Sequence, residues 1–394
     1  MISSDLFSPT AETLESQGGM WTAREIAQQP QMWLRVEKLL AAERGSLQQF
    51  LAPVVDDPSA RIVLTGAGTS AFIGQCLQPA LAARLRCRID AIATTDIVSA
   101  PQLWLKSAAP TLLVSFARSG SSPESVATLT LAEQLLPNVR HLVVTCNKDG
   151  ELAVRARKMR NAHVVVLPEA TNDRGFAMTS SFTCMVLAAS LAFGAIEPAT
   201  VARLSRSAEL LLAQMPSCAQ QLVGSRFERV IYLGSNELLG LAREAALKLL
   251  ELTDGRIATL AESTLGFRHG PKSMVDGNTL VVVMLSNAAY TRAYDVDLLE
   301  ELRRDGRAGG ILALSGRADG RLPGEHLLFA GMDGASDIEL SLLHVIVAQC
   351  YAFAESLAHG LTPDVPNTAG VVNRVVQGVT IYPWQEQDED VPRR

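Results

Sequence analysis

The sequence has few aromatic residues, and its first residues do not resemble a secretion signal. Phe, Trp and Tyr make up 5% of its 394 residues, and residues 1–19 lack the basic-then-apolar order of a signal peptide. No apolar run approaches the ~20 residues that a membrane span requires. The formal net charge of −6 offers no basic surface for a nucleic acid. We therefore expect a soluble cytoplasmic protein with neither a nucleic-acid nor a membrane partner.

Cysteine is also sparse, and no C-x-x-C pair occurs. This pattern favours buried, reduced thiols over a disulfide framework or a zinc site. Five of the histidines show no spacing typical of metal ligands, so we expect neither a metal nor an organic cofactor. The residues concerned are Cys76, Cys87, Cys146, Cys184, Cys218 and Cys350, and His141, His163, His326, His344 and His359.

Strand-like and helical stretches alternate along the chain, which predicts an α/β fold of parallel sheets covered by helices on both faces. The order of strand, Gly-Ser loop and helix recurs in the second half, which indicates an internal duplication. The predicted strands are 61–65, 89–93, 111–116, 141–145, 162–167, 229–233, 279–285, 310–314 and 326–329. Long helices are predicted at 179–193, 205–223, 238–252 and 338–359.

The N-terminal residues 1–58 are predicted to form a helical segment. Thr22 and Glu25 have the spacing of a capping box, and Pro30 separates that helix from a second one over 31–51. We place a first domain at 59–204, a second at 222–382, and a charged, disordered tail at 383–394.

Two loops rich in glycine and hydroxyls follow predicted strands. Gly66-Ala67-Gly68-Thr69-Ser70 follows the first strand, and Arg118-Ser119-Gly120-Ser121-Ser122 follows the third. Ligands of open parallel sheets bind at such positions, and free amides, hydroxyls and the Arg118 cation suit a phosphate monoester. The alternative is a dinucleotide fold, because Gly66-x-Gly68-x-x-Ala71 satisfies a relaxed fingerprint. The acid that this fold requires is misplaced, since Asp90 begins its strand and Asp96 lies past the end.

Three charges share one stripe of the apolar helix 238–252, and Arg243 points away from them. Glu244, Lys248 and Glu251 fall within roughly 60° of one another on a helical wheel. A surface ion pair is one interpretation. The other is a buried stripe facing a cleft where protons are transferred, with His269 on the nearby turn 266–272 as a further acid–base group.

Five stretches together resemble the sugar isomerase (SIS) family of phosphosugar-binding domains. They are the two glycine-rich loops, the charged helix 238–252, the turn 266–272 and Gly175–Thr183. The resemblance covers about residues 61–381 and implies two tandem SIS domains. The second half is similar to the isomerase domain of glucosamine-6-phosphate synthase. Residues 171–175 and 373–380 make the chain most similar to the galactosamine-6-phosphate deaminase/isomerase family, also named tagatose-6-phosphate ketose/aldose isomerase.

The resemblance implies conversion of D-galactosamine 6-phosphate to D-tagatose 6-phosphate and ammonia. Thr69, Ser70 and the Arg118–Ser122 loop would hold the 6-phosphate. Glu251 would move a proton between C2 and C1, with Glu244 and Lys248 orienting the reacting groups. His269 would open the sugar ring from the neighbouring subunit, which implies a homodimer. A plain aldose/ketose isomerase and a non-catalytic phosphosugar sensor are the alternatives.

Three departures from the family pattern stand out. Ala117 replaces a serine that often begins the phosphate loop, and Gln377 stands where the synthase has a lysine. The expected absence of an N-terminal glutaminase domain predicts that the chain takes no ammonia from glutamine.

Overall fold

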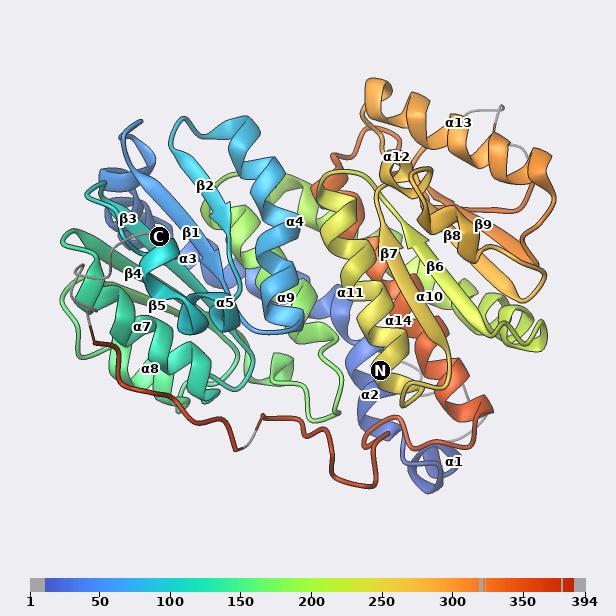
Figure 1. Cartoon of the computed structure of the whole chain (residues 1–394), viewed down its shortest axis with the longest axis horizontal. Helices are drawn as coiled ribbons and strands as arrows, with labels where there is room; N and C mark the ends of the chain where they lie inside the picture. Colours follow the sequence, from blue (N-terminus) through green and yellow to red (C-terminus); the bar gives the residue numbers. More distant parts are fainter. Residues whose placement is uncertain (1–10, 319–321, 323, 377, 386–394) are drawn as a thin grey trace, which may run out of the picture.

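Two five-stranded parallel sheets lie side by side with helices between them (Figure 1). The structure is a computed structural model that describes residues 11–318, 322, 324–376 and 378–385. The predicted α/β class and the duplication are confirmed. Gln377 and residues 386–394 of the predicted tail lie outside the described residues.

Both sheets have the same strand order once read from the same edge. The first is β2-β1-β3-β4-β5 and the second is β7-β6-β8-β9-β10. The first contains β1 (Arg61–Thr65), β2 (Arg88–Ala91), β3 (Thr111–Ala117), β4 (Val139–Thr145) and β5 (Ala162–Val166). The second contains β6 (Arg229–Leu233), β7 (Ala258–Glu262), β8 (Thr279–Met284), β9 (Gly310–Ser315) and β10 (His326–Leu328).

The duplication extends to the backbone of one turn in each half. Gly68 precedes the helix that follows β1 with φ +54°, and Asn236 precedes the helix that follows β6 with φ +53°. A Cβ on Gly66 would approach Ser70 to 2.6 Å, and one on Gly234 would approach the carbonyl oxygen of Leu238 to 2.5 Å. Each half therefore begins with the same tight strand-to-helix turn.

Apolar helices fill the space between the sheets. They are α4 (Thr69–Arg84), α9 (Ser180–Ala192), α11 (Glu237–Leu252) and α14 (Asp337–Ala358). By length and composition α14 could cross a membrane, but 89% of its most apolar stretch is buried inside the molecule. It is the central core helix of the second half.

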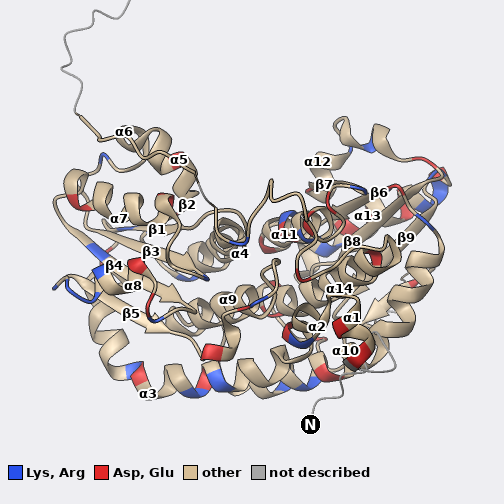
Figure 2. Cartoon of the chain, turned by 90° about the horizontal axis from the view of Figure 1, so that it is seen from below, with Lys and Arg blue, Asp and Glu red and all other residues tan. Residues whose placement is uncertain are grey.

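The remaining helices cover the outer faces. Figure 2 shows α3 (Gln29–Val55) and α10 (Val201–Gly224) running along one side of both halves. The smaller helices are α1 (Ala11–Ser16), α2 (Met20–Ala27), α5 (Thr94–Ser99), α6 (Pro101–Trp104), α7 (Pro123–Leu135), α8 (Glu151–Ala156), α12 (Thr264–Phe267) and α13 (Ala289–Asp305).

The predicted capping box is wrong. Helix α2 begins at Met20, before Thr22, and has no side-chain cap. The Glu25 carboxylate instead accepts the backbone N–H groups of Arg174 and Gly175. Pro30 does mark a boundary, because α2 ends at Ala27 and Pro30 lies in the first turn of α3, where its missing N–H has no cost.

Helices α4 and α11 pack against each other in opposite directions. Lys248, near the end of α11, contacts Thr69 at the start of α4, whereas Arg243 donates to Gln75 further along α4 at 2.7 Å. The carboxyl ends of the two sheets therefore point in opposite directions, and the start of α4 meets the end of α11.

Candidate functional site

The charged stripe of α11 is buried where α11 meets the start of α4. The Lys248 ammonium is fully buried and donates to Thr69 Oγ1 at 2.9 Å. It also forms a hydrogen-bonded ion pair with Glu251 and lies 3.4 Å from Glu244 Oε1. The interpretation as a surface ion pair is therefore wrong.

The two carboxylates of the stripe differ in their access to solvent. Glu244 is fully buried, and neither of its oxygens has a hydrogen-bond partner among the described residues. The side chain of Glu251 keeps 22% of its surface exposed. Only Glu251 can therefore meet a small molecule that enters from solvent.

Burial decides the protonation of the stripe. It raises the pKa of Glu244 to about 8, although the nearby Lys248 acts to lower that pKa. For Lys248, burial alone would lower the pKa, but the attraction of Glu244 and Glu251 outweighs it and the pKa is raised. Near neutral pH the stripe thus holds the Lys248 ammonium and a largely protonated Glu244.

The two hydroxyl-rich loops leave the same edge of the first sheet. Strands β1 and β3 pair with Thr65 opposite Ser115, so the loops that follow them are neighbours. Thr69 and Ser70 lie buried in the first turn of α4. Their position at a helix N-terminus suits an anion, and the Thr69 hydroxyl joins this cradle to the charged stripe.

The second loop is held by its neighbours. Its Ser119 carbonyl accepts from Asn147 at 2.9 Å, and the hydroxyls of Ser122 and Ser125 are 2.7 Å apart. Ser121 is exposed, while Ser119 and Ser122 are half-buried. All three hydroxyls border the edge where Thr69 and Ser70 lie.

Arg118, predicted to add a cation to the phosphate loop, is bound by backbone carbonyls. Its buried guanidinium donates to the carbonyls of Phe176 at 2.9 Å, Gly175 at 3.2 Å and Arg374 at 2.9 Å. Burial lowers the pKa of Arg118, while the charge of Glu251 acts to raise it, which places the guanidinium near the stripe. Arg118 joins two distant segments beside the cradle.

Three residues support the site in ways that the sequence did not predict. The buried Asp173 accepts the backbone N–H groups of Thr179 and Ser181, each at 2.8 Å, and so secures the start of α9. Arg374 donates to the Asp173 carbonyl at 2.9 Å. Glu25 holds Arg174 and Gly175, the two residues that follow Asp173. Burial, and then the charge of Asp173, raise the pKa of Glu25 to about 8. Only the polar run 171–175 before an apolar helix signalled Asp173.

His269 does not meet the stripe of its own chain. It stands exposed after α12, and α12 is tied to the start of α11 by the hydroxyls of Ser235 and Thr264, 2.9 Å apart. Glu251 lies near the other end of α11, on the order of 20 Å away along the helix axis. One chain therefore supplies every predicted group except an imidazole.

The corresponding edge of the second half is occupied by a carboxylate of the chain itself. The buried Asp295 accepts from Ser235 Oγ at 3.0 Å, Thr264 Oγ1 at 2.8 Å and the Ser286 N–H at 3.0 Å. The donors that would hold an anion are already engaged there.

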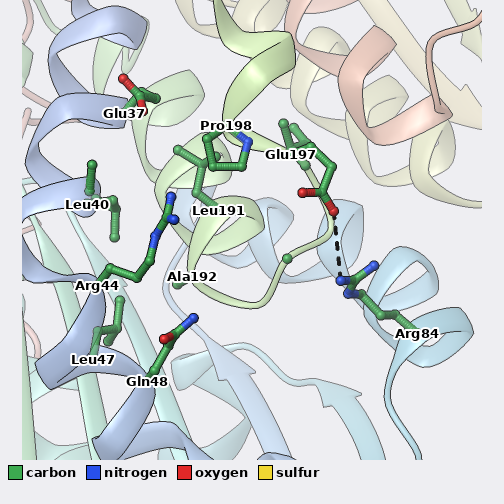
Figure 3. A pocket seen from close by; sticks show the side chains of 13 residues that line it. Glu37, Leu40, Arg44, Leu47, Gln48, Arg84, Leu191, Ala192, Glu197 and Pro198 are labelled. Carbon is green, nitrogen blue, oxygen red and sulfur yellow. Dashed lines mark ion pairs between the residues drawn. The ribbon is translucent and has the colours of Figure 1, made fainter.

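A separate cavity of about 250 Å³ lies at the far ends of α4 and α9 (Figure 3). Leu40, Leu47 and Leu191 form its apolar wall, and Arg84 approaches Glu197 to 3.9 Å at its rim. None of the predicted site residues lines it. Within the described part of the chain, no group of three or more His, Cys, Asp or Glu residues could hold a metal ion.

Comparison with known proteins adds a family to this geometry. The SIS domain family profile matches residues 57–195. An AgaS protein of Streptomyces coelicolor is 50% identical over 92% of this chain and 95% of its own length. The D-galactosamine-6-phosphate deaminase AgaS of Escherichia coli is 44% identical over 93% of this chain and 97% of its own length.

A solved structure extends the match to three dimensions. The tagatose-6-phosphate ketose/aldose isomerase from Escherichia coli has a TM-score of 0.86 and 40% identity, covering 95% of this chain and 99% of that one. The predicted resemblance is confirmed over both halves. The chain belongs to the SIS-domain family that includes the D-galactosamine-6-phosphate deaminases AgaS.

Proposed function

We propose that this protein is an enzyme that converts D-galactosamine 6-phosphate to D-tagatose 6-phosphate and ammonia. The observation that carries the proposal is the contact between Lys248 and Thr69. It brings the acid–base stripe of the second half onto the hydroxyl-rich edge of the first half. The identity to the deaminases over nearly the whole chain supports the choice of an amino-sugar phosphate.

The first half binds the phosphate in this scheme. Thr69 and Ser70 offer their hydroxyls at the start of α4, and Ser119, Ser121 and Ser122 add hydroxyls from the neighbouring loop. Arg118 contributes its charge while it holds the surrounding backbone. A phosphate dianion requires such converging donors.

The chemistry is a proton transfer along the sugar. His269 of a second copy opens the ring, which places an aldehyde at C1 and acidifies the C2 proton. Glu251 removes that proton and returns it to C1, while one proton passes from the C2 amine to the C1 oxygen, so that C1 becomes an alcohol and C2 an imine. Water adds to the imine and ammonia leaves. Lys248 and the protonated Glu244 stabilise the charge that develops on the C1 and C2 substituents.

The proposal requires a homodimer, because His269 is far from Glu251 in its own chain. It also places the enzyme in the cytoplasm. All six cysteines are unpaired, which suits a reducing compartment.

The test is ammonia release from D-galactosamine 6-phosphate, measured beside D-glucosamine 6-phosphate. We expect release from the galacto substrate with tagatose 6-phosphate as the sugar product. Interconversion of tagatose 6-phosphate with its aldose, without ammonia, would instead establish the plain isomerase that the solved structure's name suggests. Tight sugar-phosphate binding without turnover would establish a sensor.

A further inference from the structure

The C-terminal segment crosses from the second half back to the first. We call residues 361–376 and 378–385 the C-terminal strap; they follow α14 and run beneath both halves (Figure 1). The Asp364 carboxylate accepts the N–H of Thr22 at 2.7 Å, and Asn367 donates to Asp254 at 2.8 Å. Trp384 packs against the core of the first half. The strap is thus anchored along its length.

The middle of the strap borders the candidate site but turns apolar side chains to solvent. The Arg374 carbonyl is bound by Arg118, whose charge interacts with Glu251. Around it, Val371 is 80% exposed, Val372 52% and Val376 50%. Neighbouring exposed apolar residues on an anchored segment are typical of an interaction surface.

The surface that carries His269 has a similar character. Leu265 of α12 is exposed, as is Tyr290 of α13 at 78%. Tyr294 is partly exposed and bonds to Tyr290 through their hydroxyls, 2.9 Å apart. Arg268, beside His269, pairs with Asp297 and Glu301, which lie on the same face of α13 as the two tyrosines because their spacing is three and four residues.

We propose that these two surfaces meet in a dimer: Leu265, Tyr290 and Tyr294 of one copy dock on Val371, Val372 and Val376 of the other. The inference rests on the proposed function, since His269 must reach the Glu251 of another copy. The strap is the exposed apolar surface next to that site, and the His269 loop carries the matching one. Two-fold symmetry makes the contact twice per dimer.

The composition of both surfaces suits such a contact. Tyrosine and aliphatic side chains form the centre of an interface, and charged residues form its rim. Here the rim charges are already paired within the chain, since Lys272 bonds to Glu301 and Asp305. A stable interface buries roughly 800 Å² on each partner, so these six residues are its centre rather than its whole extent.

The test is the mass of the purified full chain in solution, measured by sedimentation velocity over a dilution series. Wild type should sediment as a dimer. Val371→Asp combined with Val372→Asp should weaken association roughly tenfold or more, because two carboxylates would be buried without partners. Tyr290→Asp should do the same from the other surface. Leu210→Asp, an exposed apolar position on α10, is the matched control and should remain a dimer.

Opposite charges placed on the two surfaces should restore association, a result that misfolding of a variant cannot produce. Val371→Asp combined with Tyr290→Lys in one chain should associate more tightly than Val371→Asp alone. Unfolding in urea checks that each variant is folded. A wild-type monomer, or dimers unaffected by both surface variants, would overturn the interface. Ammonia release from galactosamine 6-phosphate is scored separately, so a failed interface with active enzyme leaves the proposed function standing.

Discussion

At the scale of single residues, Glu251 and Glu244 differ through burial rather than through chemical type. They share one helix face and one partner, Lys248. Glu251 keeps contact with solvent, while Glu244 is enclosed and its pKa is raised to about 8 by burial. The exposed carboxylate can take a proton from a substrate, and the enclosed one can only set the charge around it.

Glu251→Gln tests the assigned base. The amide cannot accept the C2 proton, so exchange of that proton with deuterated solvent should fall by about 10²–10⁴-fold, as followed by NMR. Binding of the sugar phosphate, measured by calorimetry, should change little because the proposed phosphate contacts lie on the first half. Glu237→Gln, at the other end of α11, serves as the control. Undiminished exchange in Glu251→Gln would rule out this carboxylate as the base.

Glu244→Gln tests the buried acid through the pH dependence of stability. The pKa of Glu244 is about 8 in the folded chain and 4.5 as the reference, so folding favours its protonated form. That contribution is full below pH 4.5 and is lost as the pH rises toward 8. Between pH 5 and 8 the wild type should lose up to about 4 kcal/mol that Glu244→Gln retains, measured by urea unfolding.

Glu25 titrates in the same range in both proteins, so the comparison isolates Glu244. Glu37→Gln on α3 is the control and should follow the wild-type curve. Parallel stability curves for Glu244→Gln and wild type would show that the buried carboxyl is ionised throughout.

At the scale of elements, the same turn precedes α4 and α11, but a different residue type adopts its positive φ in each half. Gly68 adopts φ +54° without a side chain, whereas Asn236 adopts φ +53° with one. Asn236→Gly should therefore raise the free energy of unfolding by about 1 kcal/mol, and Gly68→Ala should lower it by about 1–3 kcal/mol. Urea denaturation measures both.

Gly45→Ala is the comparison, and it should raise the free energy of unfolding by about 1 kcal/mol. Gly45 lies within helix α3 and has open space around it. A neutral Gly68→Ala would mean that the turn does not require glycine.

The sequence predicted most elements because their periodicity was strong, and the exceptions have physical reasons. Strand β7, Ala-Thr-Leu-Ala-Glu, was missed because Leu260 is its only large apolar residue and no residue in it is fully buried. Helix α13 was missed because Arg, Asp and Glu dominate it and its apolar face is narrow. Both lack the pattern that marks a core element.

The site residues were predictable as types, but their contacts were not. Lys248 and Thr69 are far apart in the chain, and no local pattern announces their hydrogen bond. The carbonyls that Arg118 binds could not be predicted because they come from two distant segments. Glu25 looked like part of a helix cap because only the fold brings Arg174 and Gly175 to it.

At the scale of the whole molecule, two inactive variants should restore each other if His269 acts between copies. In a mixed dimer of Glu251→Gln and His269→Ala, one site carries both changes and the other carries neither. Random mixing makes half of the dimers mixed, so the mixture should recover about one quarter of wild-type activity. Each variant alone should remain inactive.

The control for this experiment is whether the two variants are mixed before or after they refold. Mixing the folded variants under conditions that prevent subunit exchange should give no recovery, whereas mixing before refolding should give it. No recovery after co-refolding would place the ring-opening imidazole within the same chain.

The contacts of Asp295 bear on how many sugar-phosphate molecules one chain binds. Duplication of a phosphosugar module would ordinarily give two equivalent receptors in one polypeptide. Here Ser235, Thr264 and Ser286 already bind Asp295, so the second module carries a carboxyl group of the chain in place of a ligand. A titration with sugar phosphate should saturate at one molecule per chain, and the second module is left to supply acid–base groups to sites that it does not itself contain.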